Sequence, residues 1–297
     1  MRLRWVSVVA AVALIAGCTT SSENPPFAKD GQFPNWPALL DDFRFHWTAA
    51  PGIDLLSGPA VIVRAYTESY EIASMTFDIK SVYPGFMRAT PENQSRDGDF
   101  LNELIGIRPL WPYERDKPPP GVAHFGFNTD HLLELAPTGN GYRAIVCTGS
   151  YSNFIKSTVQ PDAYFSAASQ VTTDGVHPTD PYPVDAFSGV SVRQIVFTQH
   201  DPRIPADAPA PVTTAQRGPA PAPQIDVFGN WFVTASSTTG WGPAVSDTDT
   251  FPSVELTKRC SDAMPDDEAQ RRAIMTGYKK QPLPHGDAVP GWPLKVE

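Results

Sequence analysis

The feature that most constrains this chain is an uncharged segment near its start. Met1-Arg2-Leu3-Arg4 carries positive charge, and Trp5–Gly17 follows without a charged side chain. A membrane-spanning helix needs roughly 20 apolar residues, whereas a signal peptide needs a shorter apolar region. We therefore expect residues 1–17 to be a signal peptide and the remainder of the chain to fold after export.

The uncharged segment ends in the motif Leu14-Ile15-Ala16-Gly17-Cys18. An apolar residue, two small residues and a cysteine form a lipobox, in which diacylglycerol is attached to the cysteine sulfur and cleavage frees the cysteine amine for another acyl chain. Each buried CH₂ group contributes about 0.8 kcal/mol, so two or three chains anchor a protein firmly. The motif predicts lipidation of Cys18 and attachment to the outer face of the cell membrane. A secretory signal that happens to contain a cysteine is the alternative.

The composition limits the partners of the exported chain. Without residues 1–17 it has 21 Lys and Arg against 32 Asp and Glu, a net charge of −11. An acidic protein is a poor candidate for nucleic acid, so the expected partners are the membrane, through the lipid anchor, and a lipid or envelope protein as ligand. Proline makes up about 11% of the chain, twice the usual share of about 5%, which predicts many rigid loops.

If Cys18 is lipidated, Cys147 and Cys260 remain, and both meet an oxidising environment after export. A bond between them would close a long loop. In the chain-entropy model such a bond stabilises the folded protein by up to about 4–5 kcal/mol. The sequence favours this disulfide over two separate buried thiols. Cys147 ends an apolar run expected to be a strand, and Cys260 follows the strand-like stretch Ser253–Leu256.

Periodicity predicts two helices in the first third of the chain. In Trp36–Trp47, Pro37 suits a first turn and several apolar residues fall on one helical face. Pro59–Met75 shows the clearest helical pattern, with Ser57 as a candidate cap. On this helix Arg64 and Glu68 are four residues apart, and we expect them to form an exposed ion pair. Two short helices are expected at Asp99–Ile107 and Asp266–Thr276.

Alternating patterns predict an antiparallel series of strands after the helices. The expected strands are His131–Leu135, Tyr142–Thr148, Val190–Gln199, Asn230–Ala235 and Phe251–Leu256. Asn140-Gly141 between the first two is a strong hairpin signal. The expected organisation is a tether at 18–34, a single α+β domain at 35–260 with insertions near 84–121, 160–188 and 201–224, and a short helix with a Pro-rich surface tail at 261–297.

Helices followed by an antiparallel series of strands indicate an α+β fold. With Pro59–Met75 as the long helix and the strands above, the chain resembles the nuclear-transport-factor-2-like (cystatin-like cone) fold. That resemblance implies N-terminal helices packed on a curved antiparallel sheet, with a pocket between them and Pro-rich stretches as insertions. The lipobox, Phe43-Arg44-Phe45-His46-Trp47 and Gly58–Tyr66 also resemble lipoproteins of the mycobacterial type, which implies a location and no activity.

No catalytic motif of the nucleophile-elbow, zinc-protease, Walker or EF-hand kind is present, and neither a cofactor nor a metal site is expected. Gly139–Ala144 fits a dinucleotide fingerprint but joins two strands, which excludes that interpretation. The acidic cluster Asp174, His177, Asp180 and Asp185 is better explained by turn chemistry than by cation binding.

The resemblance places a pocket between the Pro59 helix and the sheet, and its candidate residues are His46, Tyr66, Tyr70, Asp78 and Arg143. Each also has a structural explanation; Tyr66 and Tyr70 in particular are expected as core residues whose hydroxyls reach the surface.

The favoured hypothesis is a non-enzymatic binding or accessory protein for a lipid, glycan or envelope partner. It predicts an aromatic cavity or an exposed apolar patch on the 201–224 loop. The alternative is an envelope hydrolase or isomerase, which predicts a His or carboxylate of displaced pKa in a cleft.

Overall fold

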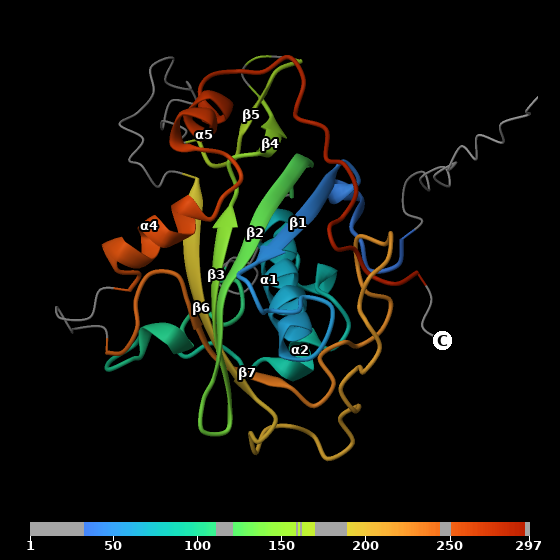
Figure 1. Cartoon of the computed structure of the whole chain (residues 1–297), viewed down its shortest axis with the longest axis vertical. Coiled ribbons are helices and arrows are strands. Elements are labelled where there is room, and N and C mark those ends of the chain that lie inside the picture. Colours follow the sequence, from blue (N-terminus) through green and yellow to red (C-terminus); the bar gives the residue numbers. More distant parts are fainter. Residues whose placement is uncertain are drawn as a thin grey trace, which may run out of the picture.

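A long helix lies on one face of a twisted sheet, and two shorter helices lie on the other (Figure 1). The computed structural model describes residues 33–110, 121–158, 160, 162–169, 189–243 and 251–294. The predicted signal peptide, Cys18 and the acidic cluster at 174–185 lie outside these residues.

The described part of the chain contains four α-helices, three short 3-10 helices and seven strands. The helices are α1 (Pro59–Thr76), α2 (Phe86–Ala89), α4 (Val254–Asp262) and α5 (Glu268–Met275), with 3-10 turns at η1 (Ala38–Leu40), η2 (Ile79–Ser81) and η3 (Asn102–Leu104). The strands are β1 (Phe43–Ala49), β2 (His124–Pro137), β3 (Gly141–Gly149), β4 (Asn153–Lys156), β5 (Tyr164–Ser166), β6 (Val190–Thr198) and β7 (Phe232–Ser237).

The strands form one open sheet in the order β5-β4-β2-β3-β6-β7, and β1 pairs with β2 outside this order. β1 runs parallel to β2, and the other pairs are antiparallel. The expected mixed class and the β2–β3 hairpin are confirmed: Gly141 begins β3, and the Thr138 amide donates to its carbonyl at 2.8 Å.

Each sheet face has its own apolar core because side chains alternate along a strand. Trp47, Leu132, Val146 and Ile195 pack with the buried side of α1. Ile145, Cys147 and Val192 pack with Cys260 of α4 and Met275 of α5. The sheet is therefore covered on both faces, by one long helix and by a pair of short ones.

The helix predicted at Trp36–Trp47 is wrong. Only Ala38–Leu40 turns, as a 3-10 helix, and Phe43–Ala49 is strand β1. Phe43, Phe45 and Trp47 are buried at every second position, a strand period that their aromatic side chains favour. The apolar residues of this stretch satisfy a helical spacing as well, and pairing with β2 decides between the two.

Three further local predictions need correction. Ser253–Leu256 is not a strand but the beginning of α4, where the Ser253 hydroxyl accepts from the Leu256 amide at 3.2 Å. Ser57 does not cap α1, since Gly58 occupies that position and the Ser57 hydroxyl donates to Asp54. The short helix expected at Asp99–Ile107 is the single 3-10 turn η3. By contrast, α5 agrees with the helix predicted at Asp266–Thr276 and begins with a capping box.

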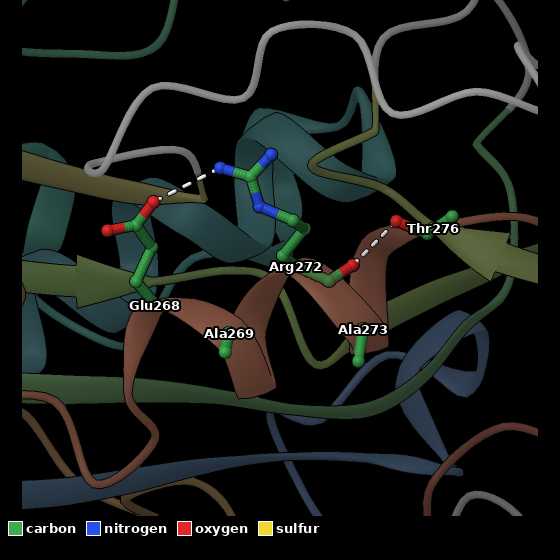
Figure 2. A pocket seen from close by; sticks show the side chains of 5 residues that line it. All are labelled: Glu268, Ala269, Arg272, Ala273 and Thr276. Atoms are coloured by element: carbon green, nitrogen blue, oxygen red, sulfur yellow. Dashed lines mark hydrogen bonds and ion pairs between the residues drawn. The ribbon is translucent and has the colours of Figure 1, made fainter.

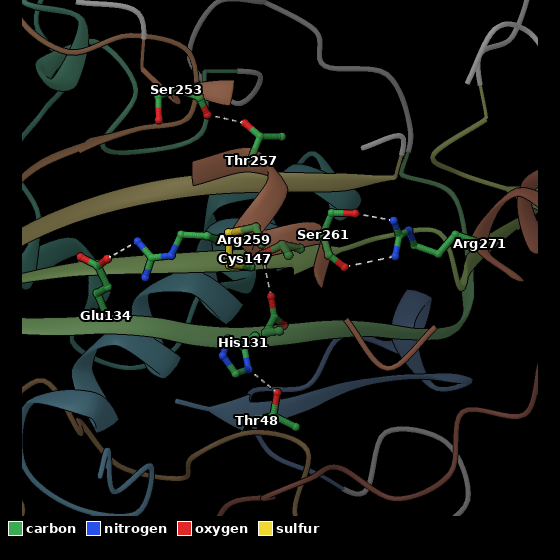
Figure 3. The surroundings of a disulfide bond; sticks show 12 residues. Thr48, His131, Glu134, Cys147, Ser253, Thr257, Arg259, Ser261 and Arg271 are labelled. Carbon is green, nitrogen blue, oxygen red and sulfur yellow. Dashed lines mark hydrogen bonds and ion pairs between the residues drawn. A yellow bond between two sulfur atoms is a disulfide. The ribbon is translucent and has the colours of Figure 1, made fainter. Parts of the chain in front are cut away.

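The predicted disulfide is confirmed. Cys147 of β3 and Cys260 of α4 are bonded, with a Cα–Cα distance of 5.2 Å and a sequence separation of 113 (Figure 3). Both cysteines are fully buried. Arg259 of the same helix pairs with Glu134 of β2 at 2.7 Å, and the Arg271 guanidinium donates to the Ser261 hydroxyl at 2.5 Å. These contacts hold α4 against the sheet and α5 against α4.

Residues 280–290 of the C-terminal tail are exposed or half-buried, in agreement with the expected surface position, but Gly291 and Trp292 are buried. Trp292 is only 1% exposed, and its backbone pairs with Ala220 in the segment 201–224. That segment forms no helix or strand, in agreement with its seven prolines, but Gln216, Ala220 and Ala222 are buried. Loop and tail together cover the side of α1 that the sheet leaves free.

Candidate functional site

Helix α1 is buried on nearly every side, so its polar residues lie inside the protein. The predicted exposed pair Arg64 and Glu68 is wrong: these side chains are 0% and 2% exposed. Two groups of buried polar residues surround α1. We call the group formed by Trp47, Arg64, Glu68, Tyr83 and Trp292 the Glu68 cluster, and the group formed by Tyr70, Glu71, Asp130, Thr148 and Arg193 the acid–arginine cluster.

In the Glu68 cluster, three neutral donors meet one carboxylate. The Trp47 indole N–H donates to Glu68 Oε1 at 2.8 Å, while the Tyr83 hydroxyl and the Trp292 indole N–H donate to Oε2 at 2.7 and 2.8 Å. Arg64 Nε lies 4.0 Å from Oε1. Burial raises the pKa of Glu68, and the Arg64 charge and the three donors oppose this shift. The carboxylate is supplied with donors by its own chain, which indicates a structural role.

Arg64 connects this cluster to three loops. Its Nη1 donates to the carbonyls of Leu55 and Gln216, each at 3.1 Å, and its Nη2 donates to the Pro290 carbonyl at 2.6 Å. The guanidinium carbon also lies 4.1 Å from the centre of the Trp292 ring. One buried cation thereby joins α1 to the segment before it, to the 201–224 loop and to the C-terminal tail.

In the acid–arginine cluster, α1 meets the middle of the sheet. Arg193 of β6 places its guanidinium carbon 3.7 Å from the centre of the Tyr70 ring and its Nη2 3.7 Å from Glu71 Oε1. Asp130 of β2 is fully buried, and the Thr148 hydroxyl of β3 donates to its Oδ1 at 2.6 Å. Its second oxygen, Oδ2, has no hydrogen-bond partner among the described residues. Glu71 is the open side of the cluster, with 23% of its side chain exposed.

The carboxyl groups of this cluster have displaced acidities. Burial raises the pKa of Asp130 well above its ordinary value; the Thr148 donor opposes the shift, and the charges of Glu71 and Glu68 add to it. Burial also raises the pKa of Glu71, against the charge of Arg193. Among the described residues Asp130 therefore has no ion-pair contact while Glu71 pairs with Arg193, and burial raises the pKa of both carboxyl groups.

The predicted pocket residues divide between this cluster and the rest of the fold. Tyr70 belongs to the acid–arginine cluster, and the Tyr66 ring lies 6.3 Å from the Tyr70 ring. The Tyr66 hydroxyl does not reach the surface as expected: it donates to the Ile107 carbonyl at 2.6 Å, and burial raises its pKa. The structure therefore brings two of the five candidates together on α1.

The other three candidates lie elsewhere. His46 stacks on Phe127 at 4.4 Å between ring centres, its Nε2 lies 2.8 Å from the His285 carbonyl, and burial lowers its pKa. Asp78 accepts from the Lys80 amide at the start of η2. Arg143 is a partly exposed residue of β3 whose Nη2 lies 3.5 Å from Glu134. Each of the three has a local contact outside the acid–arginine cluster.

Sequence reasoning missed Glu71, Asp130 and Arg193. A signal was present in the strand phase: Asp130 is two residues before buried Leu132, and Arg193 is two residues before buried Ile195. A charged residue in phase with core residues points into the protein. The register between β2, β3 and β6 was needed to show that these positions lie near one another on the α1 face.

A concave region lies on α5, away from both clusters (Figure 2). It is a hollow of 590 Å³ lined by Glu268, Ala269, Arg272, Ala273 and Thr276. Arg272 pairs with Glu268 at 3.1 Å, and the Thr276 hydroxyl donates to the Arg272 carbonyl at 2.7 Å. Two alanines and an ion pair along one helix offer no nucleophile–base pair, so the acid–arginine cluster is the better candidate.

The described residues contain no group of three or more His, Cys, Asp or Glu side chains placed to hold a metal ion. Within the same residues, no helix is long and apolar enough to cross a membrane. Comparison with protein-family models, with curated proteins and with solved structures found no match. Fold and site together define a disulfide-bonded protein of mixed helix and sheet with a buried acid–arginine cluster beneath its long helix.

Proposed function

We propose that this protein is a cell-envelope lipoprotein, anchored through acyl chains on Cys18, whose folded domain serves as a binding or accessory protein for a lipid, glycan or envelope partner. The observation that carries the proposal is the Cys147–Cys260 disulfide. The chain has three cysteines, so this bond leaves Cys18 without a disulfide partner in its own chain. Structural disulfides persist in oxidising compartments, which supports export.

Three of the described histidines have local hydrogen-bond contacts within the fold. His46 contacts the His285 carbonyl, His124 Nδ1 lies 2.7 Å from the Asn153 amide oxygen, and His131 Nδ1 lies 2.8 Å from the Thr48 hydroxyl. The 201–224 loop gives no support as a docking patch, because the large exposed apolar residues of the described chain lie outside it. Partner recognition must therefore use another surface.

Substitution of the predicted lipidation site tests the anchor. The wild-type protein should incorporate labelled palmitate and partition into the detergent phase, whereas Cys18→Ser should lose both properties and be released in soluble form. The double variant Cys147→Ala/Cys260→Ala is the matched control, because it removes two cysteines but should keep the label. Retention of Cys18→Ser in membranes, or a wild-type protein without label, would exclude the proposal.

The acid–arginine cluster favours a second candidate function, a hydrolase or isomerase. With its raised pKa, Asp130 would supply a proton, Glu71 would accept one, and Arg193 would stabilise developing negative charge. A screen with acyl esters, glycosides and isomerisable ketones should then find an activity that Asp130→Asn and Glu71→Gln abolish. Asp78→Asn, a carboxyl change outside the cluster, should leave it intact. Equal rates in all three variants would exclude this candidate.

A further inference from the structure

The C-terminal segment Val289–Trp292 lies between two other segments and pairs with both. On one side the Val289 amide donates to the Phe45 carbonyl at 3.1 Å, and the Trp47 amide donates to the Val289 carbonyl, so the segment extends the sheet beyond β1. On the other side the amides of Trp292 and Ala220 donate to each other's carbonyls at 2.8 and 3.0 Å.

A side-chain pocket accompanies this backbone pairing. The Trp292 indole lies against Arg64 and Tyr83, with 6.0 Å between the centres of the Trp292 and Tyr83 rings, and its N–H donates to Glu68. Arg64 also binds the Pro290 carbonyl. Gly291 permits the close approach, since a Cβ at that position would collide with the Gly218 carbonyl oxygen. Main-chain pairing and one anchoring side chain are how proteins recognise extended peptides.

The chain that leads to this segment contacts β1 through the His285 carbonyl, which lies 2.8 Å from His46 Nε2. It leaves α5 and passes to the β1 side of the molecule (Figure 1). Residues 280–289 are exposed or half-buried and form no helix or regular strand. Pro282 and Pro284 lie in this connection, and none of its residues takes part in the pairs among β2, β3 and β6.

We infer that β1, the strand-like residues 218–220 and the α1 residues Arg64 and Glu68 form a binding groove for an extended, tryptophan-bearing segment. Val289–Trp292 occupies this groove within its own chain. The C-terminal segment of a second copy is the partner that fits it, because that segment carries the same residues and would re-form every contact. Exchange of an identical element joins two protomers without a new interface. The inference does not depend on the proposed anchor.

Hydrogen exchange in the full-length protein tests whether the segment detaches by itself. After correction for intrinsic rates, the amides of Val289, Trp292 and Ala220 should exchange at least tenfold faster than those of β3 and β6. This result would mean that the groove opens while the sheet stays folded. Equal rates in the two sets would mean that the segment leaves only on global unfolding, and would overturn the inference.

A peptide supplied in trans tests the groove. A fluorescent peptide of residues 284–294 should bind the Trp292→Ala protein saturably and raise its melting temperature. The wild-type protein should bind it at least tenfold more weakly, because its own tail competes at an effective concentration in the millimolar range. The same peptide with Trp292→Ala is the control and should not bind. No binding to a folded Trp292→Ala protein, or equal binding of both peptides, would overturn the inference.

Discussion

The indole N–H of Trp292 donates to Glu68 Oε2 at 2.8 Å, although the two residues lie 224 positions apart in sequence. This bond places the last aromatic side chain of the protein against its longest helix. Glu68 is deeply buried, so its charge depends on donors that come from β1, from Tyr83 and from the C-terminal tail. Trp292 is thus part of the core.

Loss of the indole donor should destabilise the fold. Trp292→Phe keeps most of the apolar surface but removes one donor from a buried carboxylate, for which we expect a loss of about 1–3 kcal/mol in the free energy of unfolding. Urea unfolding measures this loss. Trp241→Phe, at a half-buried ring that packs on Phe251, is the control and should change stability by less. Equal effects of the two substitutions would contradict a special role for the Glu68 bond.

Asp130 should make stability fall as pH rises. Burial raises its pKa in the folded state, so above about pH 4, where an unfolded Asp loses its proton, the native protein binds more protons than the unfolded chain. The contribution of Asp130 to the free energy of unfolding is fully present below that pH. It is lost as the pH rises toward the pKa that Asp130 has in the folded protein. Asp130→Asn should remove this dependence, with little change at pH 4 and a gain at pH 8.

Thermal unfolding between pH 4 and pH 8 measures the Asp130 effect, and each unit of pKa displacement corresponds to about 1.4 kcal/mol. The control is Asp207→Asn, because Asp207 is exposed and its replacement should leave the pH profile unchanged. A wild-type profile parallel to that of Asp130→Asn would show that Asp130 ionises normally in the folded protein.

Arg193 and Glu71 should be coupled, but modestly. Their closest atoms lie 3.7 Å apart and the Glu71 side chain is 23% exposed, so solvent weakens the pair. A double-mutant cycle of Arg193→Met and Glu71→Gln should give a coupling free energy of about 1 kcal/mol. Arg193→Met alone should cost more, because it also removes the contact with the Tyr70 ring. A coupling indistinguishable from zero would mean that the two side chains act independently.

Reduction of the disulfide should release α4 from the sheet. Removing a native disulfide costs about 2–5 kcal/mol. Dithiothreitol under conditions that reduce the buried bond should lower the urea midpoint of the wild-type protein, while the Cys147→Ala/Cys260→Ala variant should unfold at the same midpoint with or without it. Unchanged wild-type stability after verified reduction would contradict the prediction.

Part of the fold could be predicted because its signals are local. The helix Pro59–Thr76 begins at a proline suited to a first turn, and Asn140-Gly141 forms its hairpin between two apolar runs. Phe43–Ala49 was mistaken for a helix because its apolar residues fit both periods. Pairing with the neighbouring strand β2 selects the strand conformation, and the local sequence carries no signal of this pairing.

The candidate site was less predictable than the fold. Helical spacing places Tyr66 and Tyr70 on one face of the long helix, and the pocket expected there made them candidates. Glu71, Asp130 and Arg193 come from three elements whose register cannot be read from one sequence. The placement of a charge inside a protein depends on what covers it. The sheet and Arg193 cover Glu71, and the tail and loop 216–222 cover Arg64 and Glu68.

The sequence by itself determined the cysteine count that allows one disulfide, the mixed helix and sheet class, and the long helix. These depend on composition and on patterns within short stretches of the chain. Only the tertiary structure decided that Cys147 meets Cys260, that Asp130 is fully buried, and that Trp292 is inside. The physical reason is that burial and hydrogen bonding of these groups depend on partners far away in the sequence, which chain folding alone brings within reach.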